Sequence, residues 1–496
     1  MERKGLQLNR SSRTPLLIVF LTVFIDLLGF GIVLPLLPRY AKHFDADGLT
    51  LGLLMASFSL MQFLFAPLWG RLSDRTGRRP ILMLGLAGST LFYTMFGFTT
   101  SLGAGGLLLG LGVIPWLFIC RIGAGIAGAT IPTAQAYIAD VTGPKERARG
   151  MALIGAAFGI GFTFGPLLGA AFIPGELGDA DTLARPEVRA RLQLSDNQER
   201  SILKQIDLSS GELRAGRTSL TRKQRDEIRT RRDDAIRGLL SADQYAGWLQ
   251  LSAPSPAPGY LAGVLSGLAL LSAIFLLPES LQTGASGAPV RARFNWASLH
   301  GALTHPQIGL ILFTMFLTTF AFAQFESTLS LLTEFLGLSD RHNYFVFAYI
   351  GLILALSQGL LVRRLVPRWG EFVMSVVGTV LMTTGLLLVG AAGLSDSRAM
   401  LFAVLPLCVI GFSALNPSLQ SLLSRQTAAE QQGGILGLGQ SMAALARILG
   451  PLVGLPLTDW NMVYPYWTAA GLMAVGVVLA LGLKTPAPDA AESPAA

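Results

Sequence analysis

Charged residues are scarce in this chain, at 14% of 496 residues, whereas soluble proteins carry about 25%. Cysteine and histidine are rarer still, with two and four residues. Cys120 and Cys408 lie far apart in apolar runs and the histidines are scattered, so the sequence predicts neither a disulfide framework nor a metal site. The Gly159-x-Gly161 spacing follows no strand and lies in an apolar run, which argues against a dinucleotide loop. With no catalytic triad visible either, we expect no cofactor and no enzymatic activity.

Apolar residues make up 51% of the chain. They gather into runs about as long as a bilayer-spanning helix needs, roughly 20 residues. We expect twelve such helices, at 15–38, 49–69, 81–101, 113–140, 150–173, 259–277, 306–328, 343–362, 372–392, 400–424, 433–456 and 464–483. The predicted fold class is therefore an all-α membrane protein, with the lipid bilayer as its surroundings.

Lysine and arginine are placed asymmetrically between the two predicted membrane faces. The short loops on one side, together with both tails, hold 18 of them, and the short loops on the other side hold four. Because short cytoplasmic loops are enriched in these residues, the bias predicts that both termini are cytoplasmic. The net charge of +8 then requires no nucleic-acid partner. We expect a multi-pass protein of the plasma (inner) membrane, acting as a monomer.

The predicted spans divide the chain into seven parts. These are a cytoplasmic tail (1–14), helices one to five (15–173), an extracytoplasmic helical insert (174–258), helix six (259–277), a cytoplasmic central loop (278–305), helices seven to twelve (306–483) and a cytoplasmic tail (484–496).

The insert repeats the pattern Leu-Ser/Thr-x-x-Gln at Leu194–Gln198, Leu220–Gln224 and Leu240–Gln244. In each copy the Ser or Thr can cap a following helix. The pattern is similar to the L-T-x-x-Q repeats of small helical periplasmic proteins of stress and metal responses, which suits a place outside the membrane. The alternative is a solvated helical hairpin with no function of its own.

The link from Gly70 to Pro80 combines a dense group of charges with glycines that permit a tight turn. It resembles the loop between helices two and three of the major facilitator superfamily, G-x-x-x-D-R-x-G-R-R/K, at every fixed position. The resemblance implies a cytoplasmic gate in which Asp140 lies near Arg78. Its residues here are Gly70, Asp74, Arg75, Gly77, Arg78, Arg79 and Asp140.

Further segments resemble the drug:proton antiporters of that superfamily, tetracycline exporters among them. Phe24–Pro35 resembles their first-helix signature, and Arg121–Gly128 resembles the fourth-helix signature with its membrane-embedded arginine. The fifth helix resembles their antiporter motif, through Gly155, Gly159, Gly161, Gly165, Pro166 and Gly169. The resemblance covers about 15–170 most fully, and the insert departs from it.

An internal repeat connects the two halves of the chain. Gly165-Pro-Leu-Leu-Gly169 matches Gly450-Pro-Leu-Val-Gly454 at an offset of 285, and Leu72-x-x-Arg75-x-Gly77 matches Leu365-x-x-Arg368-x-Gly370 at an offset of 293. Two six-helix bundles related in this way form the parallel repeat of the major facilitator fold.

Four charged residues are expected well inside the spans, where ionised side chains are costly and often mark a substrate or proton path. They are Asp26, Arg121, Glu326 and Arg447. A carboxylate that gains and loses a proton suits a proton-coupled carrier, and Arg121 lies at a depth where it can pair with Asp26. The alternative for either couple is a static structural ion pair.

Uncharged polar side chains in the spans are candidates for a substrate cavity, or else bond across helices. They are Gln62, Gln135, Gln324, Gln358, Asn416 and Gln420. We predict a secondary carrier that exports amphipathic drugs or small organic molecules in exchange for protons by alternating access. The alternatives are a non-transporting receptor or sensor on the same fold, and a proton symporter that takes up a small metabolite.

Overall fold

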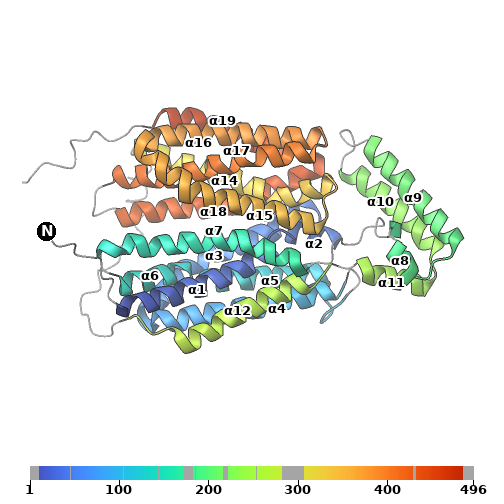
Figure 1. The fold of residues 1–496 in the computed structure, drawn as a ribbon, viewed down its shortest axis with the longest axis horizontal. Coiled ribbons are helices and arrows are strands. Elements are labelled where there is room, and N and C mark those ends of the chain that lie inside the picture. The colour runs from blue at the N-terminus through green and yellow to red at the C-terminus, as the bar shows by residue number, and fades with distance from the viewer. Residues whose placement is uncertain are drawn as a thin grey trace, which may run out of the picture.

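The computed structural model is almost entirely helical, and it describes residues 10–44, 46–103, 106–142, 144–172, 183–184, 186–215, 222–252, 254–281, 306–427 and 432–483. The helices lie side by side along the length of the molecule, with the second half of the chain stacked on the first (Figure 1). Residues 1–9 of the predicted N-terminal tail, the C-terminal tail and nearly all of the central loop lie outside the described residues, while residues 10–14, predicted as tail, form the first turns of a helix.

The first bundle contains α1 (Arg10–Val33), α2 (Leu37–His43), α3 (Gly48–Thr76), α4 (Arg78–Ser101), α5 (Val113–Gly128), α6 (Ile131–Val141), α7 (Pro144–Phe172) and α12 (Ala257–Leu276). The second contains α14 (Pro306–Phe335), α15 (Asp340–Leu356), the π-helix η2 (Ser357–Val362), α16 (Arg363–Leu394), α17 (Arg398–Arg425), α18 (Gln432–Trp460) and α19 (Tyr464–Leu481).

Within the described residues, eleven helices are long and apolar enough to cross a membrane. With α7 at the position expected for helix five, these give the twelve helices and two six-helix bundles of the predicted fold class.

Two of the predicted spans are broken into two helices. The first divides into α1 and α2 around Pro35, and Pro38 sits in the first turn of α2. The fourth divides into α5 and α6 just before Pro132. Proline lacks the N–H that continues a helix, so it is tolerated in a first turn and interrupts the helix elsewhere.

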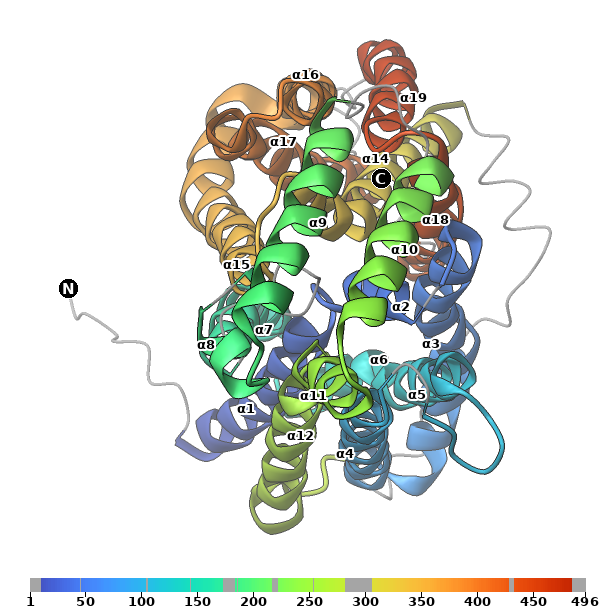
Figure 2. The same cartoon turned by 90° about the vertical axis from the view of Figure 1, so that its right-hand side faces the viewer.

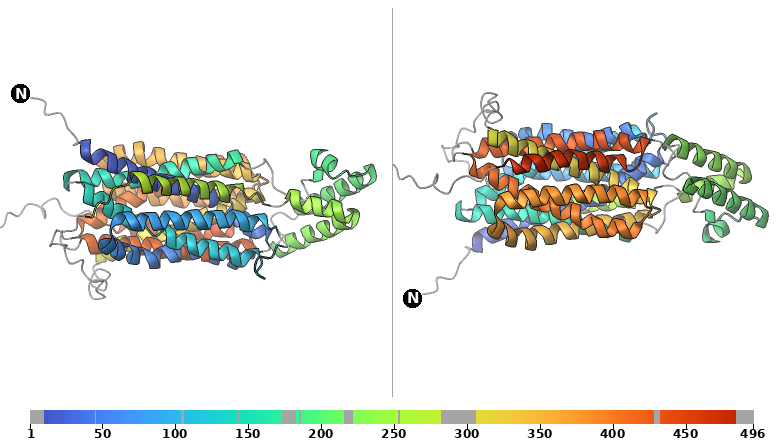
Figure 3. Two further views of the ribbon diagram at one scale, coloured as in Figure 1. Left: turned by 90° about the horizontal axis from the view of Figure 1, so that it is seen from below. Right: turned by 90° about the horizontal axis from the view of Figure 1, so that it is seen from above.

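The insert forms a separate helical hairpin beyond one end of the bundles (Figures 1 and 3). It comprises α8 (Pro186–Arg191), α9 (Asp196–Ala215), α10 (Arg222–Leu239) and α11 (Ala242–Ser252). Its own apolar core includes Leu183, Ile202, Ile206, Ile236 and Trp248. We call this end of the molecule the insert end, and the end that carries Gly70–Pro80 the motif end.

The first and third repeats of the insert cap its helices. Ser195 and Gln198 exchange hydrogen bonds at the start of α9, and Ser241 and Gln244 do the same at the start of α11. These are capping boxes, in which side chains satisfy the free N–H groups of a first turn. Gln198 Nε2 also donates to Gln244 Oε1 at 2.9 Å, which joins the two repeats. Leu220 and Thr221 of the middle repeat lie outside the described residues.

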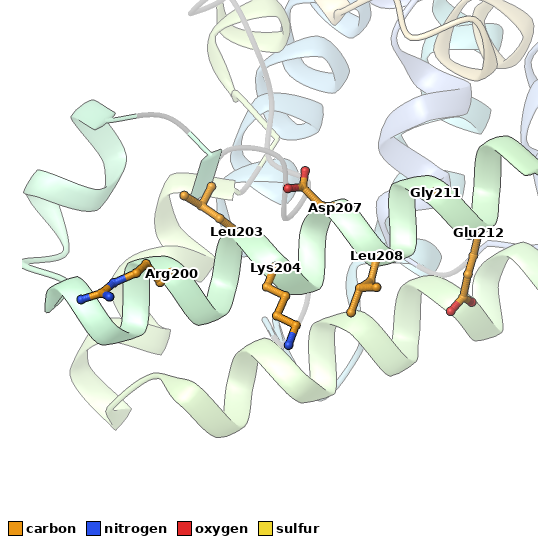
Figure 4. Close-up of a pocket in the computed structure, with 7 residues that line it drawn as sticks. All are labelled: Arg200, Leu203, Lys204, Asp207, Leu208, Gly211 and Glu212. Atoms are coloured by element: carbon orange, nitrogen blue, oxygen red, sulfur yellow. The ribbon is translucent and has the colours of Figure 1, made fainter.

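A shallow, open groove runs along α9 (Figure 4). Four of its seven lining residues are charged, two of each sign: Arg200, Leu203, Lys204, Asp207, Leu208, Gly211 and Glu212. Glu212 also pairs with Arg231 of α10 at 3.3 Å, so this face of the hairpin is a solvated, ion-paired surface.

Candidate functional site: charge networks at two ends of the bundles

At the motif end, the guanidinium of Arg78 joins three helices of the first bundle. Gly77, with φ of +106°, makes the turn between α3 and α4. Arg78 then pairs with Asp74 at the end of α3, donates from Nε to Asp140 Oδ2 of α6 at 3.1 Å, and donates to Ser73 Oγ at 2.8 Å. The structure therefore brings together the Asp74, Arg78 and Asp140 of the predicted gate motif.

Glu279, just after α12, is a member of this network that the sequence reasoning missed. Its carboxylate accepts from the backbone N–H groups of Arg78 and Arg79 at 2.9 and 3.1 Å, so it caps α4, where Gly77 offers no side chain. Ser280 Oγ donates to Asp140 Oδ2 at 3.1 Å. Burial tends to raise the pKa of Glu279, but hydrogen bonds from backbone N–H groups outweigh it and lower this pKa. The missing cap at Gly77 was the signal that an acceptor was needed.

The second bundle repeats this arrangement with the charges exchanged. Gly370, with φ of +78°, makes the corresponding turn, and Glu371 pairs with Arg425 at 2.9 Å. Under the two repeat offsets, Glu371 occupies the position of Arg78, and Arg425 that of Asp140. Each bundle thus ties its own helices together at this end by an internal ion pair.

Deeper in the first bundle, Asp26 of α1 is half-buried and accepts a hydrogen bond from Ser266 Oγ of α12 at 3.1 Å. Arg121 of α5 is buried, and its guanidinium lies 4.3 Å from the ring centroid of Phe58. In the described part of the chain its Nε and Nη1 have no hydrogen-bond partner, and no ion pair joins it to Asp26. In this conformation a cation–π contact takes the place of the expected couple.

In the second bundle, Glu326 of α14 is half-buried and Arg447 of α18 is exposed. Their charges attract one another, but among the described residues the two side chains form no ion pair. Neither couple is therefore a closed structural salt bridge in this conformation.

The predicted cavity amides separate into two groups. Gln324 is buried and donates to Pro465 O and Thr468 Oγ1 at 2.9 and 2.8 Å, so it braces α14 against α19. Gln62 donates to Gly128 O at 3.3 Å, between α3 and α5. These two match the alternative of bonds across helices.

The remaining four amides are more accessible. Gln135 of α6 and Gln358 of η2 are exposed. Gln420 donates to Asn416 at 2.9 Å within α17, and both are half-buried. The structure leaves these four accessible, and their place in a substrate cavity stays a prediction.

The glycines of the predicted antiporter motif let α7 pack closely on both bundles. A Cβ on Gly165 would lie 2.9 Å from Leu28 O of α1, and one on Gly169 would lie 2.5 Å from the Tyr344 ring of α15. A Cβ on Gly161 would lie 3.0 Å from Leu27 Cβ, and one on Gly31 would lie 3.5 Å from Pro166 Cδ. Gly159 faces Ala355 more loosely at 3.9 Å, and Gly155 lies earlier in α7. Small residues of this kind allow close backbone approach between membrane helices.

At the insert end, ion pairs join the two bundles, and the sequence reasoning did not foresee them. Arg39 of α2 pairs with Asp340 of α15 at 2.6 Å, and Lys42 pairs with Glu334 of α14 at 2.7 Å. Arg39 also donates to Thr333 Oγ1 at 2.8 Å. We call Arg39, Lys42, Glu334 and Asp340 the insert-end latch.

The proline-marked break between α1 and α2 supplies further contacts to this latch. Pro35 O accepts from Asn343 Nδ2 at 2.8 Å, and Ile32 O accepts from the Tyr344 hydroxyl at 2.9 Å. Carbonyls at a helix end lack intrahelical partners, so they can accept from the opposite bundle. No local pattern signalled the latch, because its partners lie about 300 positions apart in the sequence.

Helix α3 shows that the bundles meet more closely at the insert end than at the motif end. Near its start, Gly48 N donates to Asp459 Oδ2 of α18 at 3.0 Å, and a Cβ on Gly52 would lie 3.0 Å from Pro451 O. Most residues from 48 to 58 are buried, whereas none from 59 to 72 is buried. The conformation is closed at the insert end.

Two stacked six-helix bundles of membrane-spanning length are an architecture used by membrane transporters. The sequence profile of the Major Facilitator Superfamily matches residues 19–178 and 245–451, and the chain belongs to this family.

Named relatives are spread over bacteria and mammals. The chain is 29% identical to the class C tetracycline resistance protein of Escherichia coli, over 89% of each chain. It is 24% identical to multidrug resistance protein 2 of Bacillus subtilis (strain 168), over 97% of each. Among solved structures, the human organic anion transporter MFSD10 (TETRAN) has a TM-score of 0.59 at 23% identity, covering 95% of this chain and 99% of that one. A D-xylose-proton symporter has a TM-score of 0.64 at 15% identity, covering 95% and 97%. At these identities the two structures support the fold alone.

Proposed function

We propose that this protein is a proton-coupled exporter of amphipathic drugs or small organic molecules that works by alternating access as a monomer in the plasma (inner) membrane. Two observations support this function: the full-length similarity to tetracycline and multidrug resistance proteins, and the half-buried Asp26. The asymmetry of lysine and arginine supports cytoplasmic termini, with the insert end outside. In this orientation the described conformation is the inward-facing one.

Asp26 carries the proposal, because it is an acid inside the first bundle whose described hydrogen bond comes from a neutral serine. When ionised it would attract a cationic substrate, and when protonated it would release it. Arg121 would assist ionisation whenever its guanidinium leaves Phe58 and approaches the carboxylate, because a nearby positive charge favours the ionised form. Glu326 and Arg447 would serve the same purpose in the second bundle.

We further propose that the gate-motif residues latch the motif end when the carrier faces outward. Asp74 and Asp140 now pair with Arg78 inside one bundle. Closure would bring Asp74 toward the N-terminal end of α18, whose helix dipole favours a carboxylate.

Transport by Asp26→Asn protein tests the coupling. In everted vesicles, with a tetracycline and a lipophilic dye cation as probes, this variant should lose proton-driven accumulation at normal membrane abundance. Asp207→Asn, an exposed acid of the insert, is the matched control and should transport normally. Arg121→Ala should shift the pH profile of transport upward, because the remaining carboxylate then holds its proton to higher pH. Coupling lies elsewhere if Asp26→Asn still concentrates both probes and collapsing the proton gradient stops it, and Glu326 would be tested next.

Thiol labelling tests the orientation. Lys204→Cys, exposed on α9, should react with an impermeant reagent in intact cells, and Arg71→Cys at the motif end should react only after lysis. Ser209 would be a poor reporter, because it is buried and its hydroxyl donates to Ile206 O. The reverse labelling pattern would show that the motif end, and not the insert end, lies outside the cell.

A further inference from the structure

The insert is tethered to one bundle and rests on the other. The chain enters it after α7 and leaves it into α12, both in the first bundle. Tyr40 of α2 fixes its exit by donating to Ser255 O at 2.8 Å. Helix α10, however, packs against α18 of the second bundle. Viewed from the insert end, α9 and α10 extend from the first bundle across the second (Figure 2).

Arg229 of α10 lies close enough to the insert-end latch for its charge to act on Glu334, although in the described part of the chain the two side chains form no ion pair or hydrogen bond. Glu334 uses Oε1 to accept from Lys42, while its Oε2 is buried with no hydrogen-bond partner in the described part of the chain. The Nε of Arg229 is likewise buried there without a partner. The positive charges of Lys42, Arg39 and Arg229 all act on the Glu334 carboxylate. A buried carboxylate oxygen without a partner is costly, and a nearby cation offsets that cost.

We propose that Arg229 is a positioning residue of the latch, through which the insert fastens the insert end shut. The insert moves with the first bundle, whereas Glu334 and α18 belong to the second. Opening of the insert end must therefore separate Arg229 from Glu334 and α10 from α18. The insert then favours the conformation closed at that end, and removing the Arg229 charge shifts the equilibrium toward the open one. This inference goes beyond export itself and does not depend on the substrate.

The distance between spin labels at the insert end tests the proposal in the full-length protein. Leu107 and Trp460 are 71% and 70% exposed and lie at that end of different bundles, so each is replaced by a labelled cysteine. The native Cys120 and Cys408 are changed to alanine in this background. Arg229→Ala and Arg229→Glu should raise the ratio of open to closed populations roughly two- to fivefold, the range for a partly exposed interaction between opposite charges. Arg229→Glu, which reverses the charge, should give a larger change than Arg229→Ala, which removes it.

Arg231→Ala is the matched control, since this exposed arginine of the same helix pairs with Glu212 at the surface. It should leave the distances unchanged, and Arg229→Lys, which keeps the charge, should stay near the parent distribution. Lys42→Ala, which removes the hydrogen-bond donor to Glu334 Oε1, is the positive control and should open the insert end. The proposal is overturned if both Arg229 variants match Arg231→Ala. It is also overturned if Arg229→Lys opens that end as far as Arg229→Ala. Because the measurement needs no substrate, a failure of the export assay leaves its outcome intact.

Discussion

The two ends of the bundles use ion pairs in opposite ways. At the motif end, Arg78 holds Asp74 and Asp140 within the first bundle, and Glu371 holds Arg425 within the second. At the insert end, Arg39 and Lys42 of the first bundle hold acids of the second. The ion pairs of the motif end therefore stabilise each bundle, whereas those of the insert end determine how the bundles sit against one another.

The two sets of ion pairs also differ in whether the sequence reveals them. The motif-end network follows a compact pattern, because Gly77 and the residues around it build one turn between consecutive helices. The latch has no pattern, because any buried pair that bridges the bundles suffices. A loop motif therefore predicts the ion pairs of the motif end but gives no information on those of the insert end.

Among the variants considered, removal of Arg39 should have the largest effect on the balance between the conformations open and closed at the insert end. Arg39 and Asp340 are only 7% and 8% exposed, and loss of one partner of a buried ion pair costs about 3–5 kcal/mol. Arg39→Met should therefore shift most molecules to the conformation open at the insert end, measured as the distance between labels on Leu107 and Trp460. Arg71→Met, an exposed arginine at the motif end, is the control. If Arg39→Met gives the parent distances, this ion pair does not determine which conformation is populated.

Asp74→Asn should change the distance between the labels on Leu107 and Trp460 in the opposite direction, toward the conformation closed at the insert end. It leaves the insert-end latch intact and removes the charge that we propose closes the motif end in the outward-facing state. A carboxylate at a helix N-terminus contributes up to about 2 kcal/mol, so the insert-open population should fall and transport should slow. Asp207→Asn serves as the control. Unchanged distances together with full transport would show that the motif-end network only stabilises the first bundle.

Glu279→Gln should give the smallest effect, on stability alone. Glu279 is exposed, so loss of its charge at the start of α4 costs about 0.5 kcal/mol, at the low end for a helix cap. Because folding lowers its pKa, its contribution is present above the ordinary value of 4.5 and is lost as the pH falls through the lower folded value. The melting-temperature difference from the parent protein should hold at pH 6 and shrink at pH 4. A difference that grows on acidification would contradict this role.

The sequence by itself determined the architecture, because every constraint involved is local or repetitive. The length of the apolar runs fixes the spans. The offsets of 285 and 293 reveal two related halves, and the Gly70–Pro80 pattern points to the family. The resemblance to that family implied that Asp140 lies near Arg78, and the Ser-x-x-Gln pattern predicted the caps of the insert.

Only the tertiary structure decided which charges meet. The sequence suggested that Asp26 pairs with Arg121, since both lie at similar depth. Packing instead puts Arg121 over Phe58 and Asp26 beside Ser266. It also joins Arg39 to Asp340 and places the charge of Arg229 where it acts on Glu334. The physical reason is that an ion pair needs its two side chains within a few ångströms, which depends on how helices rotate and cross. The hydrophobic pattern fixes the existence of each helix but not the partner that each polar side chain faces.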